Sequence, residues 1–351
     1  MDVVEPRCKI DGKNADFPGV VGTMQTAGQR RMRSLRSMVV LISNLLSNRW
    51  GGSHSLTLQE SNMPDEKRTY LRVNMKITDM TGCVTLHNGV KMPYLGLGVY
   101  KAKEGEEVIN AVSYALYAGY RHIDTAVFYQ NERGVGTAIR QSGVKREEVF
   151  VTTKVWNPDQ GYESTLKAFD RSLKELGFDY LDLYLVHWPV KDKFKNTWRA
   201  VEHLYEQGRV RAIGISNFMK HHLLDLLKTA EIIPMVNQME CHPYLVQQDL
   251  IDFCADRHIQ YEAWSPLMQG RITEVELLKE LAQKHGKDSA QIVLRWNLQK
   301  GVVTIPKSVT PARILSNTRI FDFELSAEDM GKIDHLEVKR RFGADPDHFD
   351  F

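Results

Sequence analysis

The sequence predicts a single (β/α)8 barrel that is preceded by a β-hairpin and by an N-terminal extension of different composition. Eight short apolar runs follow one another between residues 95 and 305, and stretches between them carry apolar residues three or four positions apart, as amphipathic helices do. The runs recur roughly every 25–35 residues, which is the length that one strand, one helix and the two connections between them occupy. Strands that are apolar on both faces belong to a parallel sheet covered by helices. A body of about 270 residues with eight such units fits one barrel better than two domains.

Each apolar run is an expected strand. The runs are Leu95–Val99, His122–Ala126, Val149–Val155, Asp182–Trp188, Val210–Ser216, Met235–Glu240, Ile259–Trp264 and Val302–Ile305. Helical spacing is clearest in Glu104–Ala118, Thr165–Leu176 and Leu277–Lys284. Before the first run, Val84–Pro93 predicts a hairpin with Asn88 and Gly89 at its turn, placed to close the bottom of the barrel.

The first 75 residues differ from the body, so we divide the chain into an extension, residues 1–75, and a barrel, residues 76–351. The chain has 46 basic and 44 acidic side chains, a net charge of +2, and the extension alone has 11 basic and 7 acidic ones. No acidic residue lies between Phe17 and Gln59, whereas five arginines do. Such a segment is expected to be a disordered tail or a targeting segment. If it is a targeting segment, its arginine-rich, acid-poor composition resembles a mitochondrial transit peptide, and the location would then be mitochondrial. An over-extended start, with Met75 opening the chain, is a further alternative.

Composition excludes several classes of protein. A chain so close to neutral is a poor candidate for a dedicated nucleic-acid binder. The apolar run Met38–Ile42 is too short to span a bilayer, so no stable membrane insertion is expected. Four cysteines without a C-x-x-C pair suggest a reducing, cytoplasmic location and no metal site.

Polar residues end several of the apolar runs, at the rim where a parallel barrel carries its chemistry. Asp124, Tyr129, Lys154 and His187 form a set of particular interest. A buried lysine needs a carboxylate, which Asp124 supplies, and its ammonium is expected to lower the pKa of Tyr129 from about 10. A tyrosine so tuned can protonate a developing alkoxide, while a neutral histidine orients the carbonyl oxygen. The set therefore suits the proton half of carbonyl reduction, and the hydride must come from a cofactor.

The cofactor is expected to bind across the barrel mouth and not at a Rossmann motif. No G-x-G-x-x-G follows a strand. Lys307, Ser308 and Arg313 follow the eighth strand, where barrels of this kind bind phosphate. A lysine and an arginine suit a ribose 2′-phosphate, which favours NADPH over NADH.

Four motifs in order resemble the aldo-keto reductase family, from about Val84 to the C-terminus. They are Gly119–Ala126 with Tyr129–Glu132, Leu181–Pro189, Ala212–Phe218 and Ile305–Ser308. The short tail and Asp159–Thr165 resemble its 2,5-diketo-gluconate reductase and prostaglandin F synthase-like branch. The resemblance implies a catalytic tetrad of Asp124, Tyr129, Lys154 and His187.

The same resemblance implies the binding residues. For the cofactor they are Ser216, Asn217 and Gln238 at the carboxamide, Trp264 stacked on the nicotinamide, Ser265 and Leu267 nearby, Lys307, Ser308 and Arg313 at the 2′-phosphate, and Asn317 at the adenine. For the substrate they are Tyr100, Trp156, Trp188 and His187. Two positions depart from the family pattern: Ser316 replaces a common glutamate, and Phe128 replaces a smaller residue and is expected to narrow the pocket.

Two functions remain open at this point. The first is an NADPH-dependent reductase, expected to be a monomer, that converts small aldehydes and ketones to alcohols. The second is a non-enzymatic NADPH-binding regulatory subunit on the same barrel, comparable to potassium-channel β-subunits, with the basic extension as a docking arm. The complete tetrad favours the first.

Overall fold

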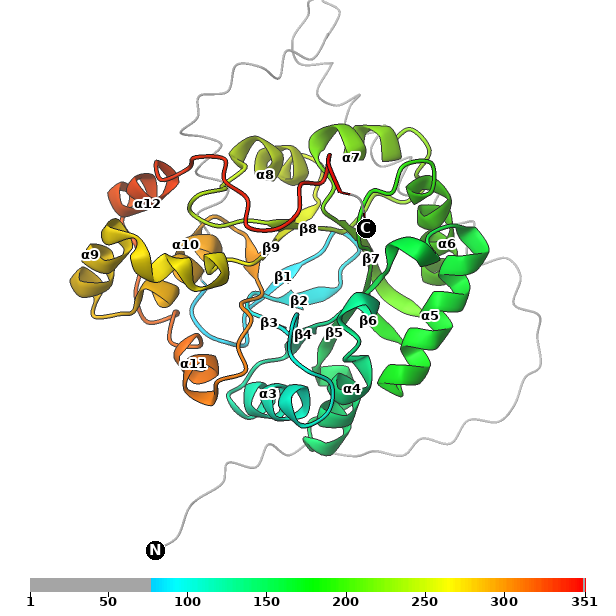
Figure 1. The fold of residues 1–351 in the computed structure, drawn as a ribbon, viewed down its shortest axis with the longest axis horizontal. Helices are drawn as coiled ribbons and strands as arrows, with labels where there is room; N and C mark the ends of the chain where they lie inside the picture. Colours follow the sequence, from blue (N-terminus) through cyan, green and yellow to red (C-terminus); the bar gives the residue numbers. More distant parts are fainter. Residues whose placement is uncertain (1–76, 350) are drawn as a thin grey trace, which may run out of the picture. The chain divides into compact units, whose positions relative to one another are not determined.

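The structure, a computed structural model, describes residues 77–349 and Phe351, and these form an eight-stranded parallel barrel surrounded by helices (Figure 1). The predicted extension, residues 1–75, lies outside the described residues. The strands of the barrel are β3 (Leu97–Gly98), β4 (His122–Asp124), β5 (Phe150–Val155), β6 (Leu181–Val186), β7 (Val210–Ser216), β8 (Val236–Glu240), β9 (Gln260–Trp264) and β10 (Val303–Thr304). All eight predicted strands are therefore present.

Consecutive strands pair in parallel from β3 to β10, and the two outer strands close the sheet. Leu95 bridges to Thr304, and Gly98 bridges to Lys307. The amide of Gly96 donates to the Thr304 carbonyl at 3.0 Å, and that of Thr304 donates to the Tyr94 carbonyl at 3.1 Å. A closed barrel leaves no free sheet edge, and it brings the carboxyl ends of all eight strands to one rim.

The helices cover the outside of the barrel because their apolar faces meet the outward side chains of the strands. They are α3 (Glu106–Tyr117), α4 (Glu132–Gln141), α5 (Tyr162–Leu176), α6 (Phe194–Glu206), α7 (Lys220–Leu226), α8 (Gln248–Ala255), α9 (Glu276–His285), α10 (Ser289–Gln299), α11 (Pro311–Ser316) and α12 (Ala327–Asp334). In β6, all six residues are buried, as expected of a strand packed on both faces. The predicted helical stretches correspond to α3, α5 and α9. No helix of the described residues is both long and apolar enough for a membrane span.

The predicted hairpin is formed by β1 (Cys83–Thr85) and β2 (Lys91–Pro93). At its turn, the Asn88 side chain donates to the carbonyl of Arg211, near the start of β7, at 2.9 Å. The neighbouring His87 ring contacts the carbonyl of His258, just before β9, at 3.2 Å. Both partners lie at the amino ends of barrel strands, so the hairpin lies at the bottom, opposite the rim formed by the carboxyl ends of the strands.

The approach of α4 to the end of α5 depends on one glycine. A Cβ atom at Gly136 would lie 1.9 Å from the carbonyl oxygen of Leu176, which belongs to the backbone and cannot rotate away. The two helices can therefore pack this closely only while position 136 has no side chain.

We expect Gly136→Ala to destabilise the barrel by about 1–3 kcal/mol, the usual cost of overpacking. Thermal unfolding measures this, at roughly 2–4 °C for each kcal/mol. Gly331→Ala in α12 is the matched control, because a Cβ there meets no atom within 4 Å. It should leave the melting temperature unchanged or raise it slightly. Equal melting temperatures for the two variants would contradict this account of the packing.

Candidate active site

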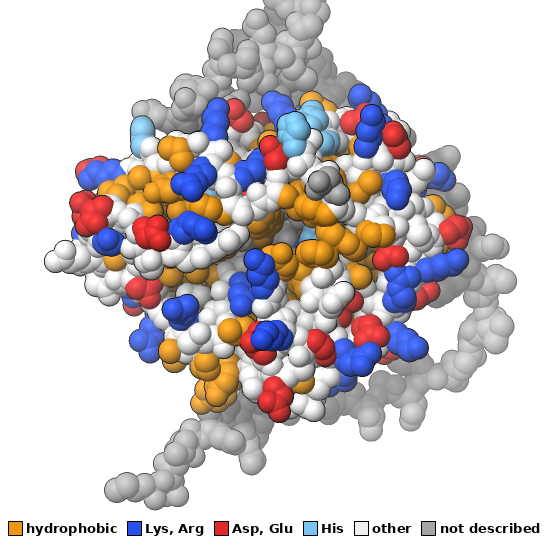
Figure 2. All heavy atoms as spheres, viewed as in Figure 1, with side chains coloured by type: hydrophobic (Ala, Val, Ile, Leu, Met, Phe, Trp, Pro, Cys, Tyr) orange, Lys and Arg blue, Asp and Glu red, His pale blue; other side chains and the backbone are white. Residues whose placement is uncertain are grey.

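A cavity of about 1390 Å³ opens at the carboxyl ends of the strands. Figure 2 shows hydrophobic side chains gathered around a hollow near the centre of this face, with lysine and arginine side chains close to it. The volume exceeds the roughly 300–1,000 Å³ that is typical of small-molecule pockets, so it suits a dinucleotide together with a substrate. Every predicted site residue except Lys154 lines the cavity, and Lys154 lies directly behind it.

Two residues of the predicted tetrad, Asp124 and Tyr129, contact the ammonium group of a third, Lys154. Asp124 ends β4, Lys154 is on β5, and Tyr129 follows in the short 3-10 helix Val127–Tyr129. Lys154 Nζ lies 2.7 Å from Asp124 Oδ1 and 3.4 Å from the Tyr129 hydroxyl, and it also donates to the Thr125 carbonyl at 2.9 Å. The side chains of Lys154 and Asp124 are both almost fully buried. Together they form a buried ion pair whose ammonium group contacts the hydroxyl of Tyr129.

Burial changes the proton affinities of these groups. Burial, the largest influence, would lower the pKa of Lys154, but the charge and hydrogen bond of Asp124 together with Tyr129 and Glu262 oppose it, and the pKa lies above its ordinary value, so the ammonium persists. Burial likewise raises the pKa of Tyr129, to about 12, and the charge of Lys154 only partly opposes this. The prediction that Lys154 brings the pKa of Tyr129 below 10 is therefore wrong for the protein alone, because desolvation of the phenolate dominates. Tyr129 keeps its proton at neutral pH.

His187, the fourth residue of the predicted tetrad, follows β6. Its ring centre lies 5.9 Å from that of Tyr129 and 5.1 Å from that of Trp156, edge to face in both cases. Burial, aided by the positive charge of Lys154, holds the pKa of His187 well below 6.5, so the ring is neutral. Its Nδ1 atom has no hydrogen-bond partner within the described part of the chain. The structure thus offers a neutral imidazole beside the phenol, as the sequence predicts.

The predicted carboxamide-binding residues join this network. Asn217 has φ 66°, a left-handed conformation that asparagine tolerates better than most residues. Its side chain donates to the His187 carbonyl at 3.0 Å and accepts a hydrogen bond from Trp264 Nε1 at 3.0 Å. Ser216 donates to the Gln238 carbonyl at 2.9 Å, and the Gln238 amide donates to Asp124 Oδ2 at 2.8 Å. The residues that would hold a nicotinamide are therefore bonded to the tetrad itself.

The predicted phosphate residues lie at the far end of the cavity. Lys307 follows β10, Ser308 is buried, and Arg313 is exposed on α11. Partial burial lowers the pKa of Lys307, and the negative charge of Glu107 opposes this only in part. Among the described residues no carboxylate forms an ion pair with the Lys307 ammonium, so it is available to an anion. Ser316 donates instead to Asp288 Oδ2 at 2.8 Å, which ties α11 to the start of α10. A cationic rim of this kind fits the 2′-phosphate of NADPH.

Aromatic side chains wall the substrate end of the cavity. Phe128 stacks on Trp156 at 4.1 Å between ring centres, and Tyr100 lies 4.9 Å from Tyr129. The ring of Phe351 also stacks on Trp156, at 5.6 Å between ring centres. Phe128 therefore lines this end of the cavity, and the narrowing of the pocket stays a prediction.

Several cavity residues were not singled out from the sequence. Among them are Lys101, Lys287, Phe342, Gly343 and Phe351. Lys101 could have been found, because it directly follows Tyr100 on the first loop of the rim. The tail residues carry no local signal, because only the return of the chain past α12 brings them to the barrel mouth (Figure 1).

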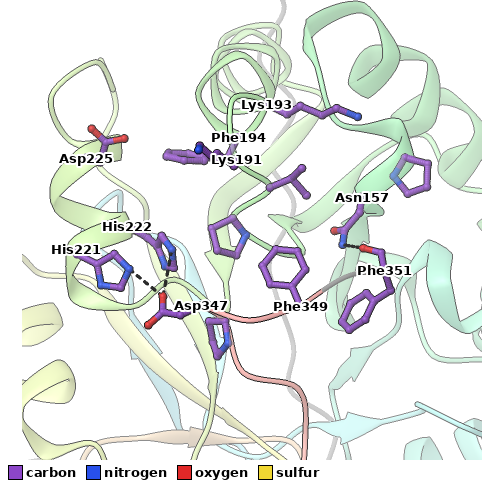
Figure 3. A pocket seen from close by; sticks show the side chains of 14 residues that line it. Asn157, Lys191, Lys193, Phe194, His221, His222, Asp225, Asp347, Phe349 and Phe351 are labelled. Carbon is purple, nitrogen blue, oxygen red and sulfur yellow. Dashed lines mark hydrogen bonds and ion pairs between the residues drawn. The ribbon is translucent and has the colours of Figure 1, made fainter.

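A second pocket of about 980 Å³ lies beside the tail (Figure 3). Asn157 donates to the Phe351 carbonyl at 2.8 Å on one side, and His221 pairs with Asp347 at 2.9 Å on the other. His221, His222 and Asp347 are close enough to bind a metal ion together. However, the backbone N–H of Met219 lies 3.2 Å from His222 Nδ1, so a neutral His222 carries its proton on Nε2, toward Asp347. These contacts therefore fasten the tail and do not form a ready metal site.

Comparison with known proteins agrees with the geometry of the rim. The model of the aldo/keto reductase family matches residues 94–338, and that of the glycine/sarcosine/betaine reductase component B subunits matches residues 1–52. The chain is 59% identical over 274 residues to glyoxal reductase of Bacillus subtilis, which covers 78% of this chain and 99% of that protein. It is 57% identical over 270 residues to 9,11-endoperoxide prostaglandin H2 reductase of Trypanosoma cruzi, covering 76% of this chain and 95% of that one. A structure of a Gox0644 variant in complex with NADPH superposes with a TM-score of 0.74 at 40% identity, covering 77% of this chain and 99% of the other.

The chain belongs to the aldo/keto reductase family. It is an NADPH-dependent oxidoreductase that reduces aldehydes or ketones to alcohols, on the fold that the sequence predicts. The regulatory-subunit alternative has less support, because the relatives named above are reductases.

Proposed function

We propose that this chain reduces small aldehydes and ketones at the barrel mouth, with Tyr129 as the proton donor. The observation that carries the proposal is the contact of the Tyr129 hydroxyl with the buried Lys154–Asp124 pair. NADPH, when bound, supplies the hydride to the carbonyl carbon. His187 donates a hydrogen bond to the carbonyl oxygen and so orients it between the imidazole and the phenol. Tyr129 then gives its proton to that oxygen, and Lys154 stabilises the phenolate that remains.

Different residues along the cavity contact different parts of the cofactor. Ser216, Asn217 and Gln238 hold the carboxamide, Trp264 stacks on the nicotinamide, and Ser265 and Leu267 line the path beyond it. At the other end, Lys307, Ser308 and Arg313 hold the 2′-phosphate, and Asn317 contacts the adenine. The donor set fits this group, because amides suit a carboxamide and the cations suit a phosphate.

We expect Tyr129→Phe to lower kcat for carbonyl reduction by roughly 10²–10⁴-fold, the usual contribution of a general acid, while leaving the Kd of NADPH nearly unchanged, because the ring remains and only the donated proton is lost. Tyr117→Phe, at the most exposed tyrosine of α3, is the matched control and should retain full activity. Activity of Tyr129→Phe within tenfold of wild type would refute this role.

Lys307 and Arg313 should determine the preference for NADPH. In the double variant Lys307→Met, Arg313→Ala, each lost charged contact is worth roughly 1.5–3 kcal/mol, so the KM of NADPH should rise at least a hundredfold. The KM of NADH should change little, because NADH has no 2′-phosphate. Lys332→Met removes an exposed lysine that pairs with Glu328 on α12, and it should change neither value. An unchanged ratio of the two KM values in the double variant would place the phosphate site elsewhere.

For the substrate, we propose short α-oxoaldehydes of the glyoxal type. Phe128 and Trp156 stack on each other at the substrate end of the cavity, and the Bacillus subtilis relative named above is a glyoxal reductase. Tyr100 and Trp188 complete the wall. The values of kcat/KM for glyoxal, methylglyoxal, a bulky aromatic ketone and a prostanoid endoperoxide distinguish this proposal from its alternatives. Higher values for the two bulky substrates would overturn it.

The division into extension and barrel is also a proposal, as are a monomeric state and a cytoplasmic location with a mitochondrial alternative. The described residues include a hairpin, eight closed strands and their helices, so the barrel lacks no element. We therefore expect the chain started at Met75 to keep the melting temperature and kcat/KM of the full chain. A fall of several degrees, or a large loss of activity, would show that the extension contributes to the folded barrel.

A further inference from the structure

A second carboxyl group lies inside the barrel, next to the tetrad, and the mechanism above does not use it. Glu262 is on β9, directly beside Gln238 in the register of β8 and β9, and it is fully buried. Its Oε2 atom accepts a hydrogen bond from Gln238 Nε2 at 2.8 Å. The same nitrogen donates to Asp124 Oδ2 at 2.8 Å. One amide group therefore bridges the tetrad aspartate and this glutamate.

The interior holds too little positive charge for two carboxylates. The titratable groups that face Glu262 are Asp124, Lys154 and His122. Lys154 is committed to Asp124 at 2.7 Å, and burial lowers the pKa of His122 to about 3, so the imidazole is neutral. Burial and the charge of Asp124 raise the pKa of Glu262 to about 8. At neutral pH, Glu262 is therefore a carboxylic acid.

The position of its second oxygen agrees with an attached proton. Glu262 Oε1 has no hydrogen-bond partner within the described residues, and it lies 3.6 Å from Nε2 of His122. The imidazole is neutral, its Nε2 contacts the Thr152 hydroxyl at 3.3 Å, and it therefore supplies no positive charge to this oxygen. A bare carboxylate oxygen would be buried without any donor, which is costly.

We propose that Glu262 is a positioning residue of this active site, because it anchors the amide of Gln238. Its protonation state also sets the cofactor preference: the neutral acid favours neither form, and the carboxylate favours the oxidised cofactor over the reduced one. This inference rests on the proposed function, in which Gln238 holds the nicotinamide carboxamide. Both amide hydrogens of Gln238 are directed to carboxyl groups, so its oxygen remains to accept a hydrogen bond from the carboxamide.

The preference for NADP⁺ or NADPH follows from the charge on Glu262. Loss of the Glu262 proton adds a negative charge one side chain behind the wall of the cavity. The oxidised nicotinamide ring is a cation and the reduced ring is neutral, so this charge attracts only the oxidised form. By linkage, binding of the cation also favours loss of the proton. As the pH rises toward and through about 8, NADP⁺ should therefore bind better relative to NADPH, and this preference should level off once Glu262 is ionised with either cofactor bound.

The test is the Kd of NADPH and of NADP⁺, measured by quenching of tryptophan fluorescence from pH 6 to 9.5. For the wild type, the ratio of the NADP⁺ value to the NADPH value should fall by about three- to tenfold across this range, equivalent to a shift of about 0.5–1 unit in the pKa of Glu262 on binding. The ratio cancels the titration of Lys307 and of the 2′-phosphate, which both cofactors share.

Glu262→Gln should bind both cofactors within about twofold of wild type at pH 7, because its amide oxygen can still accept from Gln238. Its ratio should not change with pH. Glu262→Leu should weaken both cofactors by about two- to tenfold at every pH, the equivalent of one hydrogen bond. Glu132→Gln is the matched control: Glu132 is also buried, but it bonds to Thr153 outside the cavity, so its ratio should follow the wild-type curve.

A Glu262→Gln ratio that falls with pH as the wild type does would overturn the proposal, as would wild-type affinity in Glu262→Leu. If Glu262→Leu does not fold, the pH curve of Glu262→Gln decides alone. Binding of neither cofactor by the wild type would overturn the function itself, and with it this inference. Binding without turnover of any carbonyl would overturn the proposed reaction but leave Glu262 in its role.

Discussion

The buried ion pair between Lys154 and Asp124 is the interaction on which the rest of the site depends. Its two charges lie 2.7 Å apart with almost no exposure to solvent. Neither would remain ionised in such surroundings alone, because burial raises the pKa of the carboxyl group and opposes the ammonium. Each member of the pair also makes a further hydrogen bond. The Lys154 ammonium contacts the Tyr129 hydroxyl, and the Asp124 carboxylate accepts a hydrogen bond from the Gln238 amide. The proposed proton donor and the expected cofactor site are therefore both held by the same two side chains.

The barrel makes this arrangement possible because it holds the backbone on which the pair is built. Asp124 and Lys154 come from neighbouring strands whose register is set by parallel pairing. Closure between β3 and β10 prevents the strands from sliding, and the helices outside exclude water from their other face. Loops at the rim then add the residues that contact ligands, which fits the division in this fold between a stable body and a variable mouth.

Much of this could be predicted from the sequence, and the misses have physical reasons. Apolar periodicity located all eight strands, because burial on both faces leaves a continuous run. The rim rule and the family motifs located Asp124, Tyr129, Lys154 and His187. The pKa of Tyr129 was missed, because desolvation depends on how completely the ring is enclosed. Glu262 was missed because one polar residue inside an apolar run looks like a tolerated exception, and Phe351 because nothing local links the tail to the barrel mouth.

The most direct measurement of the central claim is a double-mutant cycle on the buried pair. The free energy of unfolding is compared for wild type, Lys154→Met, Asp124→Asn and the double variant. Each single variant should lose about 3–5 kcal/mol, because it leaves the other charge buried and unpaired, and the double variant should lose much less than the sum. The same cycle on the exposed pair Arg133 and Glu175 should give a coupling of at most about 1 kcal/mol. Additive losses at Lys154 and Asp124, or a coupling no larger than that of the exposed pair, would contradict the account.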